Sequence, residues 1–138
     1  MAVMTMIDSV RTTLEPDRLI IGGHSMGGRT ASMLEAEGKT SDGLLLFGYP
    51  LHPAGQPEKL RDAHLPAIRV PVLQFNGTED ALCTPELMER ALEPVDREAW
   101  TLHWIRGADH SYAVAKSSGR TRGEVEAEIL AALKNWLG

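Results

Sequence analysis

Short apolar runs alternate with helical patterns along most of this chain. The runs cover residues 18–21, 43–48, 70–76 and 100–105. Each run is too short for a helix and is bounded by glycine, proline or polar residues, which is typical of strands buried on both faces. The pattern therefore predicts a sheet of about four strands.

Helical periodicity fills the intervals between these runs. The helical patterns cover residues 1–14, 26–37, 85–92 and 121–137. Gly38 stands where a helix usually ends, and Thr84 followed by Pro85 is a usual helix start. Thr121 and Glu124 match a capping box at the start of the last helix. Because strand and helix alternate, we predict an α/β fold, a parallel sheet with helices on both faces.

One stretch, residues 49–69, interrupts the alternation. Its helix and strand breakers are Pro50, Pro53, Gly55, Pro57 and Pro66. We expect a long excursion over the surface, with one helical turn near residues 58–62. Loops of this length form part of a binding site in some domains and are variable insertions in others, and the pattern favours neither.

Composition narrows the class of protein. The chain has 138 residues, with 14 Lys or Arg against 19 Asp or Glu and a net charge of −5. This length predicts one domain, residues 1–138, with one core. The acidic balance argues against a nucleic-acid partner, and no apolar run reaches the roughly 20 residues of a membrane helix.

The cysteine, the histidines and the N-terminal residues bear on disulfide bonds, metal sites and the cellular compartment. Cys83 is the one cysteine, so no disulfide framework is expected. Residues 1–10 lack a basic stretch and contain Asp8, so we expect no signal peptide and a cytoplasmic protein. The histidines are not spaced as zinc ligands usually are, and no metal site is expected.

A G-x-S-x-G motif runs from Gly23 to Gly27, between the first apolar run and a helical pattern. In this context the motif forms a sharp turn that exposes Ser25 at a helix N-terminus. Small residues are needed around the serine, and Gly23, Gly27 and Gly28 supply them. The backbone N–H of Met26 is the expected oxyanion donor. A nucleotide-binding turn is the alternative, but the chain lacks its glycine pattern and P-loop lysine.

A serine nucleophile needs a base and an orienting acid. Asp80 directly follows the third apolar run, and His110 follows the fourth. Because the carboxyl ends of parallel strands share one edge of a sheet, we expect Ser25, Asp80 and His110 to meet there. Glu79 and Asp109 are alternative acids, but Asp109 is too close in sequence to His110 to orient its ring easily. Asp80 is favoured over both.

The remaining histidines and the cysteine are expected to be structural. His24 should point away from Ser25, because neighbouring positions diverge at a tight turn. His103 lies within the fourth run as a packed or half-exposed strand residue. We expect His52 and His64 to be solvated loop side chains, and Cys83 to be a packing residue.

Residues 22–29, with the sequence GGHSMGGR, resemble the nucleophile elbow of α/β-hydrolases. The resemblance extends to the dienelactone-hydrolase-like branch of small predicted hydrolases. That branch includes bacterial proteins and the hydrolase-like domains of a testis-expressed protein and a chromatin-complex subunit. The further segments that carry the likeness are 48–53 (GYPLHP), 57–61 (PEKLR), 64–66 (HLP), 77–80 (GTED), 109–112 (DHSY) and 118–121 (SGRT). The resemblance implies Ser25, Asp80 and His110 as a catalytic triad, the same residues reached above.

The chain departs from this family in one large respect. An α/β-hydrolase has several strands before the elbow strand, and one of the loops among them ordinarily supplies the second oxyanion donor. This sequence begins one helical pattern ahead of the elbow strand. The resemblance therefore implies the C-terminal half of the fold, with the edge completed by a longer gene product, by a partner or by a rearranged fold.

An uncovered elbow strand bears on the oligomeric state. Leu19, Ile20 and Ile21 would line an unpaired edge, which proteins usually protect. The first helical pattern adds apolar side chains outside its core stripe, and these include Met1, Val3, Met4 and Met6. Methionine-rich surfaces adapt readily to partners. We therefore expect a homodimer, with no nucleic-acid or membrane partner.

Two functions from different classes fit these residues. The first is a serine hydrolase that cleaves an ester, thioester or related acyl bond of a small molecule through an acyl-enzyme, with no metal or organic cofactor. The alternative is a hydrolase-like binding or assembly module with weak or no catalysis. The missing strands favour the module, whereas the intact set of Ser25, Asp80 and His110 favours the enzyme.

Overall fold

The computed structural model describes residues 2–38 and 41–138. Its main elements, in chain order, are α1 (Ala2–Leu14), β1 (Ile20–His24), α2 (Met26–Glu37), β2 (Gly43–Phe47), β3 (Val72–Gly77), α3 (Pro85–Ala91), β4 (Trp100–Ile105) and α4 (Arg122–Leu137). Two short 3-10 helices are η1 (Leu65–Ala67) and η2 (Lys116–Ser118). Among the described helices, none is long and apolar enough to cross a membrane.

The strands form one parallel sheet in the order β1-β2-β3-β4, the same as their order in the chain. Partner residues run in continuous register, with Gly22 opposite Leu45 and Leu45 opposite Leu73. Parallel neighbours need a crossover, and a helix or long segment follows each of the first three strands. The predicted α/β fold with a parallel four-stranded sheet is confirmed.

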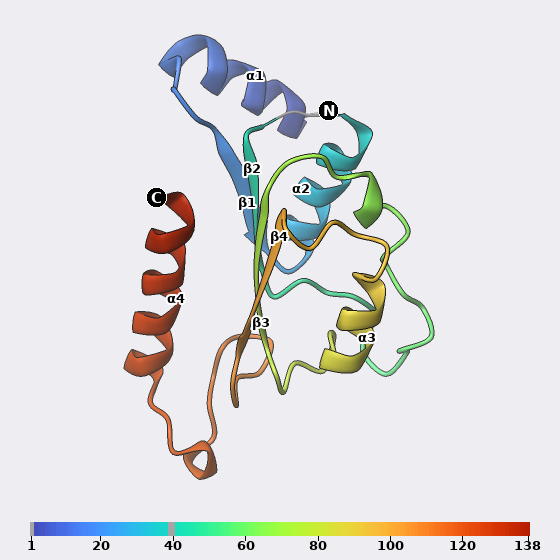
Figure 1. Ribbon diagram of the computed structural model, residues 1–138, viewed down its shortest axis with the longest axis vertical. Coiled ribbons are helices and arrows are strands. Elements are labelled where there is room, and N and C mark those ends of the chain that lie inside the picture. Colours follow the sequence, from blue (N-terminus) through green and yellow to red (C-terminus); the bar gives the residue numbers. More distant parts are fainter. Residues whose placement is uncertain (1, 39–40) are drawn as a thin grey trace.

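Helices cover both faces of this sheet (Figure 1). On one face, Leu44, Leu46 and Val72 pack in a core with residues of α2 and α3. On the other face, Leu73 and Phe75 pack with residues of α4. Successive side chains of a strand point to opposite faces, so strands that serve two cores must be apolar at nearly every position.

The glycines after the first apolar run lie inside a strand, and the prediction that the strand stops there is wrong. Gly22 and Gly23 both belong to β1. A Cβ on Gly22 would lie 2.0 Å from the carbonyl oxygen of Leu45, so only glycine fits at this point of the β1–β2 pair. Glycine therefore marks a close approach between two strands here, and not an end of the strand.

The stretch from residue 49 to residue 69 is not only a surface excursion. Tyr49, Leu51 and Leu65 are each at most 1% exposed and belong to the core. The Tyr49 hydroxyl donates to the Arg61 carbonyl oxygen at 2.6 Å, which ties the start of the stretch to a residue twelve positions later. Its helical turn is η1 (Leu65–Ala67), later in the chain than the sequence predicted.

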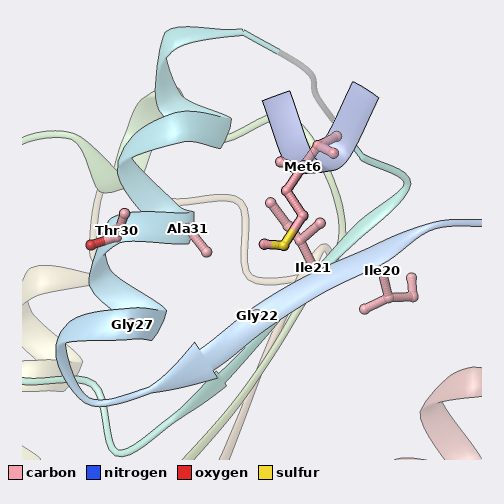
Figure 2. A pocket seen from close by; sticks show the side chains of 8 residues that line it. Met6, Ile20, Ile21, Gly22, Gly27, Thr30 and Ala31 are labelled. Atoms are coloured by element: carbon pink, nitrogen blue, oxygen red, sulfur yellow. The ribbon is translucent and has the colours of Figure 1, made fainter. Parts of the chain in front are cut away.

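β1 is an edge strand with open space on both faces. The Asp42 N–H donates to the Leu19 carbonyl oxygen, and the Ser25 N–H donates to the Phe47 carbonyl oxygen. The alternate residues Ile20, Gly22 and His24 therefore present their N–H and C=O groups to the other edge, where none of the described strands pairs with β1. One hollow beside the strand has a volume of about 500 Å³. In Figure 2, side chains from α1, β1 and α2 point into it. A second hollow, of about 440 Å³, lies between β1 and α4.

The homodimer is expected because the edge of β1 would be unpaired in a single chain. The dimer itself stays a prediction. Met6 is 59% exposed, while the side chains of Met1, Val3 and Met4 lie outside the described residues. Multi-angle light scattering across a concentration series should give twice the mass of one chain. A folded monomer at tens of micromolar would contradict the prediction.

Candidate active site

Ser25 lies at a sharp turn between β1 and α2. Its φ is 54° and its ψ is −121°, a conformation that non-glycine residues rarely adopt. The turn is tight because Gly23 and Gly28 pack backbone against backbone: a Cβ on Gly28 would lie 2.7 Å from the Gly23 carbonyl oxygen. Gly27, by contrast, faces open space, so the expectation that all three glycines are needed sterically is wrong for Gly27.

The side chains of Ser25, His110 and Asp80 form a continuous hydrogen-bonded chain. Ser25 Oγ lies 2.8 Å from His110 Nε2, and His110 Nδ1 lies 2.8 Å from Asp80 Oδ2. An ionised carboxylate can only accept, so His110 carries its hydrogen on Nδ1, and Nε2 accepts from the serine hydroxyl. The three residues expected to meet at the carboxyl edge of the sheet are in contact.

The loops after β3 and β4 hold Asp80 and His110 against each other. Gly77 ends β3 so close to the next loop that a Cβ would lie 2.1 Å from the Ala108 carbonyl oxygen. The Gly107 N–H donates to Thr78 Oγ1 at 2.8 Å. These contacts join segments about 30 residues apart in sequence, and they explain why the acid and the imidazole come together.

The Asp80 side chain is buried and fully engaged. Its exposed fraction is 0% at the side chain, against 24% for His110. The Leu82 N–H donates to Oδ1 at 2.8 Å, and Asn76 Nδ2 donates to Oδ2 at 3.1 Å. Because both oxygens are held by donors, the carboxylate has one orientation in which to accept from the imidazole.

The alternative acids have other partners. Asp109 Oδ1 accepts from the N–H groups of Ser111 and Ala113, at 2.9 and 3.0 Å, and shapes the turn that carries His110. Glu79 is exposed, and its N–H donates to the Ala108 carbonyl oxygen. Of the three acids weighed from the sequence, Asp80 is the one hydrogen-bonded to His110.

The other histidines depart in part from expectation. His52 is 2% exposed, so the prediction of a solvated loop side chain is wrong for it. It is wrong for His64 too, since His64 is half-buried and its Nε2 lies 2.8 Å from Ser32 Oγ. Burial and the nearby Arg29 charge lower the pKa of His64. These side chains are buried because the irregular segment that carries them packs into the core.

Two further histidines lie in or beside strands. His103 is half-exposed within β4, as expected, and its Nε2 lies 2.6 Å from Glu128 Oε2. His24 Nε2 lies 3.2 Å from the His110 carbonyl oxygen, and the two rings are 5.2 Å apart. His24 thus contacts the main chain of His110, whereas the sequence predicted only that His24 points away from Ser25.

Cys83 and Tyr112 lie buried close to the site. Cys83 is fully buried in the core, and burial raises the pKa of its thiol, so it carries no thiolate. Burial likewise raises the pKa of Tyr112, which stays a phenol and donates to the Phe75 carbonyl oxygen at 2.8 Å. Both side chains support the loops around the site through packing and hydrogen bonding.

Met26 is the first residue of α2, directly after Ser25. The first N–H groups of a helix have no partner within the helix, and the helix dipole favours negative charge beside them. The Arg29 N–H donates back to the Ser25 carbonyl oxygen at 3.0 Å, so the helix begins at once after the turn. The Met26 N–H thus belongs to the first turn of α2, next to Ser25.

Sequence reasoning missed the residues behind Asp80. Gln74 and Asn76 are both 0% exposed, and Trp100 is 3% exposed. They form hydrogen bonds with one another and, through Asn76, with Asp80. The available signal was the presence of two amide side chains at alternate positions of an otherwise apolar strand, where unpaired polar groups are costly.

The chain matches the profile of a known protein family. The profile of the alpha/beta hydrolase domain family matches residues 1–138, the whole chain. The chain belongs to the α/β-hydrolase family. The α/β-hydrolase fold accounts for the strand-turn-helix context of Ser25 and for the chain order Ser25, Asp80, His110.

Solved structures of α/β-hydrolases have the same fold. An α/β serine hydrolase without a lid from Xanthomonas campestris matches with a TM-score of 0.68 and 19% identity, over 97% of this chain and 55% of that one. A serine hydrolase homologue from Coxiella burnetii matches with a TM-score of 0.63 and 18% identity, over 78% of this chain and 48% of that one. A monoacylglycerol lipase from Paleococcus ferrophilus matches with a TM-score of 0.60 and 18% identity, over 78% of this chain and 65% of that one. This α/β-hydrolase chain thus spans about half the length of the first two.

Proposed function

We propose that this protein is a serine hydrolase that cleaves an ester, thioester or related acyl bond of a small molecule. The observation that carries the proposal is the chain of contacts from Ser25 Oγ to His110 Nε2 and from His110 Nδ1 to Asp80 Oδ2, both 2.8 Å long. It lies at the carboxyl edge of a parallel sheet, beside a helix N-terminus. That combination suits attack on a carbonyl carbon.

Acylation begins as His110 Nε2 takes the hydroxyl proton of Ser25. Ser25 Oγ forms a bond to the carbonyl carbon, and the carbonyl oxygen becomes an oxyanion. The tetrahedral intermediate then collapses, the bond to the leaving group breaks, and His110 returns the proton to that group. Asp80 keeps the imidazole in its Nδ1–H tautomer and stabilises the imidazolium while it exists.

Deacylation repeats these steps with water in place of the serine. His110 takes a proton from water, the oxygen attacks the acyl carbon, and the Ser25–acyl bond breaks as Ser25 regains its proton. The products are the free acid and the free enzyme. The reaction needs no electron acceptor or donor.

The Met26 N–H is the proposed donor to the oxyanion, since it follows the nucleophile at the start of α2. In α/β-hydrolases a second donor comes from a loop preceding the elbow strand. The loss of one such donor costs about 100- to 1,000-fold in rate. The Met26 N–H is therefore expected to contribute strongly to the rate.

The proposal predicts that the base is as necessary as the nucleophile. His110→Gln should lose as much activity toward a p-nitrophenyl ester as removal of the serine, since triad members act as a unit. The rates of the two variants should be compared with that of the wild type at one fixed pH, by release of nitrophenol. Activity of His110→Gln within a few-fold of wild type would count against His110 as the base.

A further inference from the structure

A chain of buried polar side chains leads from the core of the sheet to Asp80. Trp100 Nε1 donates to Gln74 Oε1 at 2.9 Å, and Gln74 Nε2 donates to Asn76 Oδ1 at 2.8 Å. Asn76 Nδ2 then donates to Asp80 Oδ2 at 3.1 Å. The chain thus links β4 to the loop after β3 through two alternate residues of β3 itself.

The direction of these hydrogen bonds is fixed by donors that cannot accept. The indole N–H of Trp100 requires an oxygen opposite it, so the amide of Gln74 must turn its NH₂ toward Asn76. The main-chain N–H of Tyr49 donates to Asn76 Oδ1 at 3.2 Å, so the amide of Asn76 must turn its NH₂ toward Asp80. Every donor in the chain therefore points toward the carboxylate.

A buried chain of polar side chains destabilises the fold unless each donor and acceptor has a hydrogen-bond partner. Gln74 and Asn76 are fully buried, and a buried amide without partners is strongly destabilising. Asn76 makes four contacts, because its Nδ2 also donates to the Tyr49 carbonyl oxygen at 3.3 Å. A complete polar network of this kind specifies one arrangement of its side chains.

We propose that Asn76 and Gln74 are positioning residues that hold the Asp80 carboxylate in the one orientation in which it accepts from His110. Asp80 Oδ1 is fixed by the Leu82 N–H, and Oδ2 is fixed from the core side by Asn76. The imidazole then approaches an oxygen that is already in place. Gln74 acts one step further back, by fixing the amide of Asn76. This role rests on the proposed function of Ser25, His110 and Asp80.

The sharpest test is the substitution Gln74→Glu, because glutamate has nearly the same shape as glutamine. Gln74 itself is hydrogen-bonded to Trp100 and Asn76 and not to Ser25, His110 or Asp80. While its carboxyl group is protonated, the new O–H donates to Asn76 as the amide did. Once it ionises, an acceptor faces Asn76 Oδ1, and the amide of Asn76 must turn its donors away from Asp80. We expect kcat at high pH to fall by about 10- to 100-fold, with KM within about twofold of wild type.

The expected signature is a descending limb in the pH profile of kcat where the wild-type profile is flat, because a buried carboxyl group ionises at raised pH. Asn135→Asp is the control, since it adds the same charge at an exposed position of α4. Its profile should match wild type. A Gln74→Glu profile that matches wild type across the pH range in which the introduced carboxyl group ionises, in folded protein, would overturn the proposal. Carbon-13 NMR of the labelled carboxyl group locates that range.

Gln74→Met serves if the glutamate variant does not fold. It preserves much of the volume but donates nothing to Asn76, and we expect kcat to fall by about 2- to 10-fold with KM unchanged. An unchanged kcat would contradict the positioning role.

A readout without turnover separates this proposal from the proposed function. The His110 ring signals in NMR spectra, assigned by comparison with His110→Gln, should shift as the introduced carboxyl group of Gln74→Glu ionises and should not do so in Asn135→Asp. If the wild type hydrolyses no ester, the proposed function fails, and the NMR titration still tests the chain. Ring signals that ignore the ionisation would refute the chain even in an active enzyme.

Discussion

Ser25→Ala should reduce ester hydrolysis by at least about a thousandfold while the protein stays folded. The hydroxyl is the nucleophile that forms the acyl-enzyme in the proposed mechanism, and triad members act as a unit. Its loss removes one hydrogen bond, to His110 Nε2, so unfolding free energy should change by about 1 kcal/mol. Alanine also keeps a Cβ at the positive φ of this turn, which leaves the backbone strain unchanged.

Ser111→Ala is the matched control, because Ser111 is exposed and follows His110 directly. It should retain wild-type rates with p-nitrophenyl acetate, measured alongside circular dichroism to verify folding. Turnover by Ser25→Ala within a few-fold of wild type would mean that the nucleophile lies elsewhere.

Asp80→Asn should lower kcat by a factor on the order of 10⁴. Asparagine has one oxygen in place of two, and both oxygens of Asp80 face donors. When the asparagine oxygen accepts from the Leu82 N–H, the new NH₂ faces His110 Nδ1. Two donors cannot bond to each other, and His110 would move its hydrogen to Nε2. In that tautomer Nε2 has no lone pair with which to accept the proton of Ser25.

Asp109→Asn provides the control for this substitution. Asp109 uses one oxygen to accept from the N–H groups of Ser111 and Ala113, and an asparagine oxygen does the same. Activity near that of wild type is expected. If Asp109→Asn were the inactive variant and Asp80→Asn the active one, the assignment of the acid would have to be reversed.

The fold could be predicted from the sequence because each apolar run is bounded by residues that end strands or begin helices. Thr121 shows this directly, since its side chain accepts from the Glu124 N–H at the start of α4, as the capping-box pattern predicts. Gly22 shows the limit. Glycine indicates both strand ends and close contacts between strands, and the choice depends on Leu45 in the neighbouring strand.

The contact between Asp80 and His110 could be anticipated from strand order alone, because parallel strands end at one edge. The hydrogen bonds behind Asp80 could not. They join Trp100 to Gln74 and Asn76 to Tyr49, pairs 26 and 27 positions apart, and their direction follows from which atoms meet. These hydrogen bonds depend on which strands are neighbours in the sheet. They also depend on the burial of the first residues of the stretch 49–69.

The most direct test of the central claim is covalent labelling with a fluorophosphonate. An activated serine attacks the phosphorus and fluoride leaves, so the reagent reports the nucleophile without requiring turnover or a known substrate. We expect mass spectrometry of the native protein to locate the adduct on Ser25. The adduct should be absent from heat-denatured protein and from Ser25→Ala, and greatly slowed in His110→Gln. A folded protein that takes up no label, or takes it up at another serine, would contradict the account.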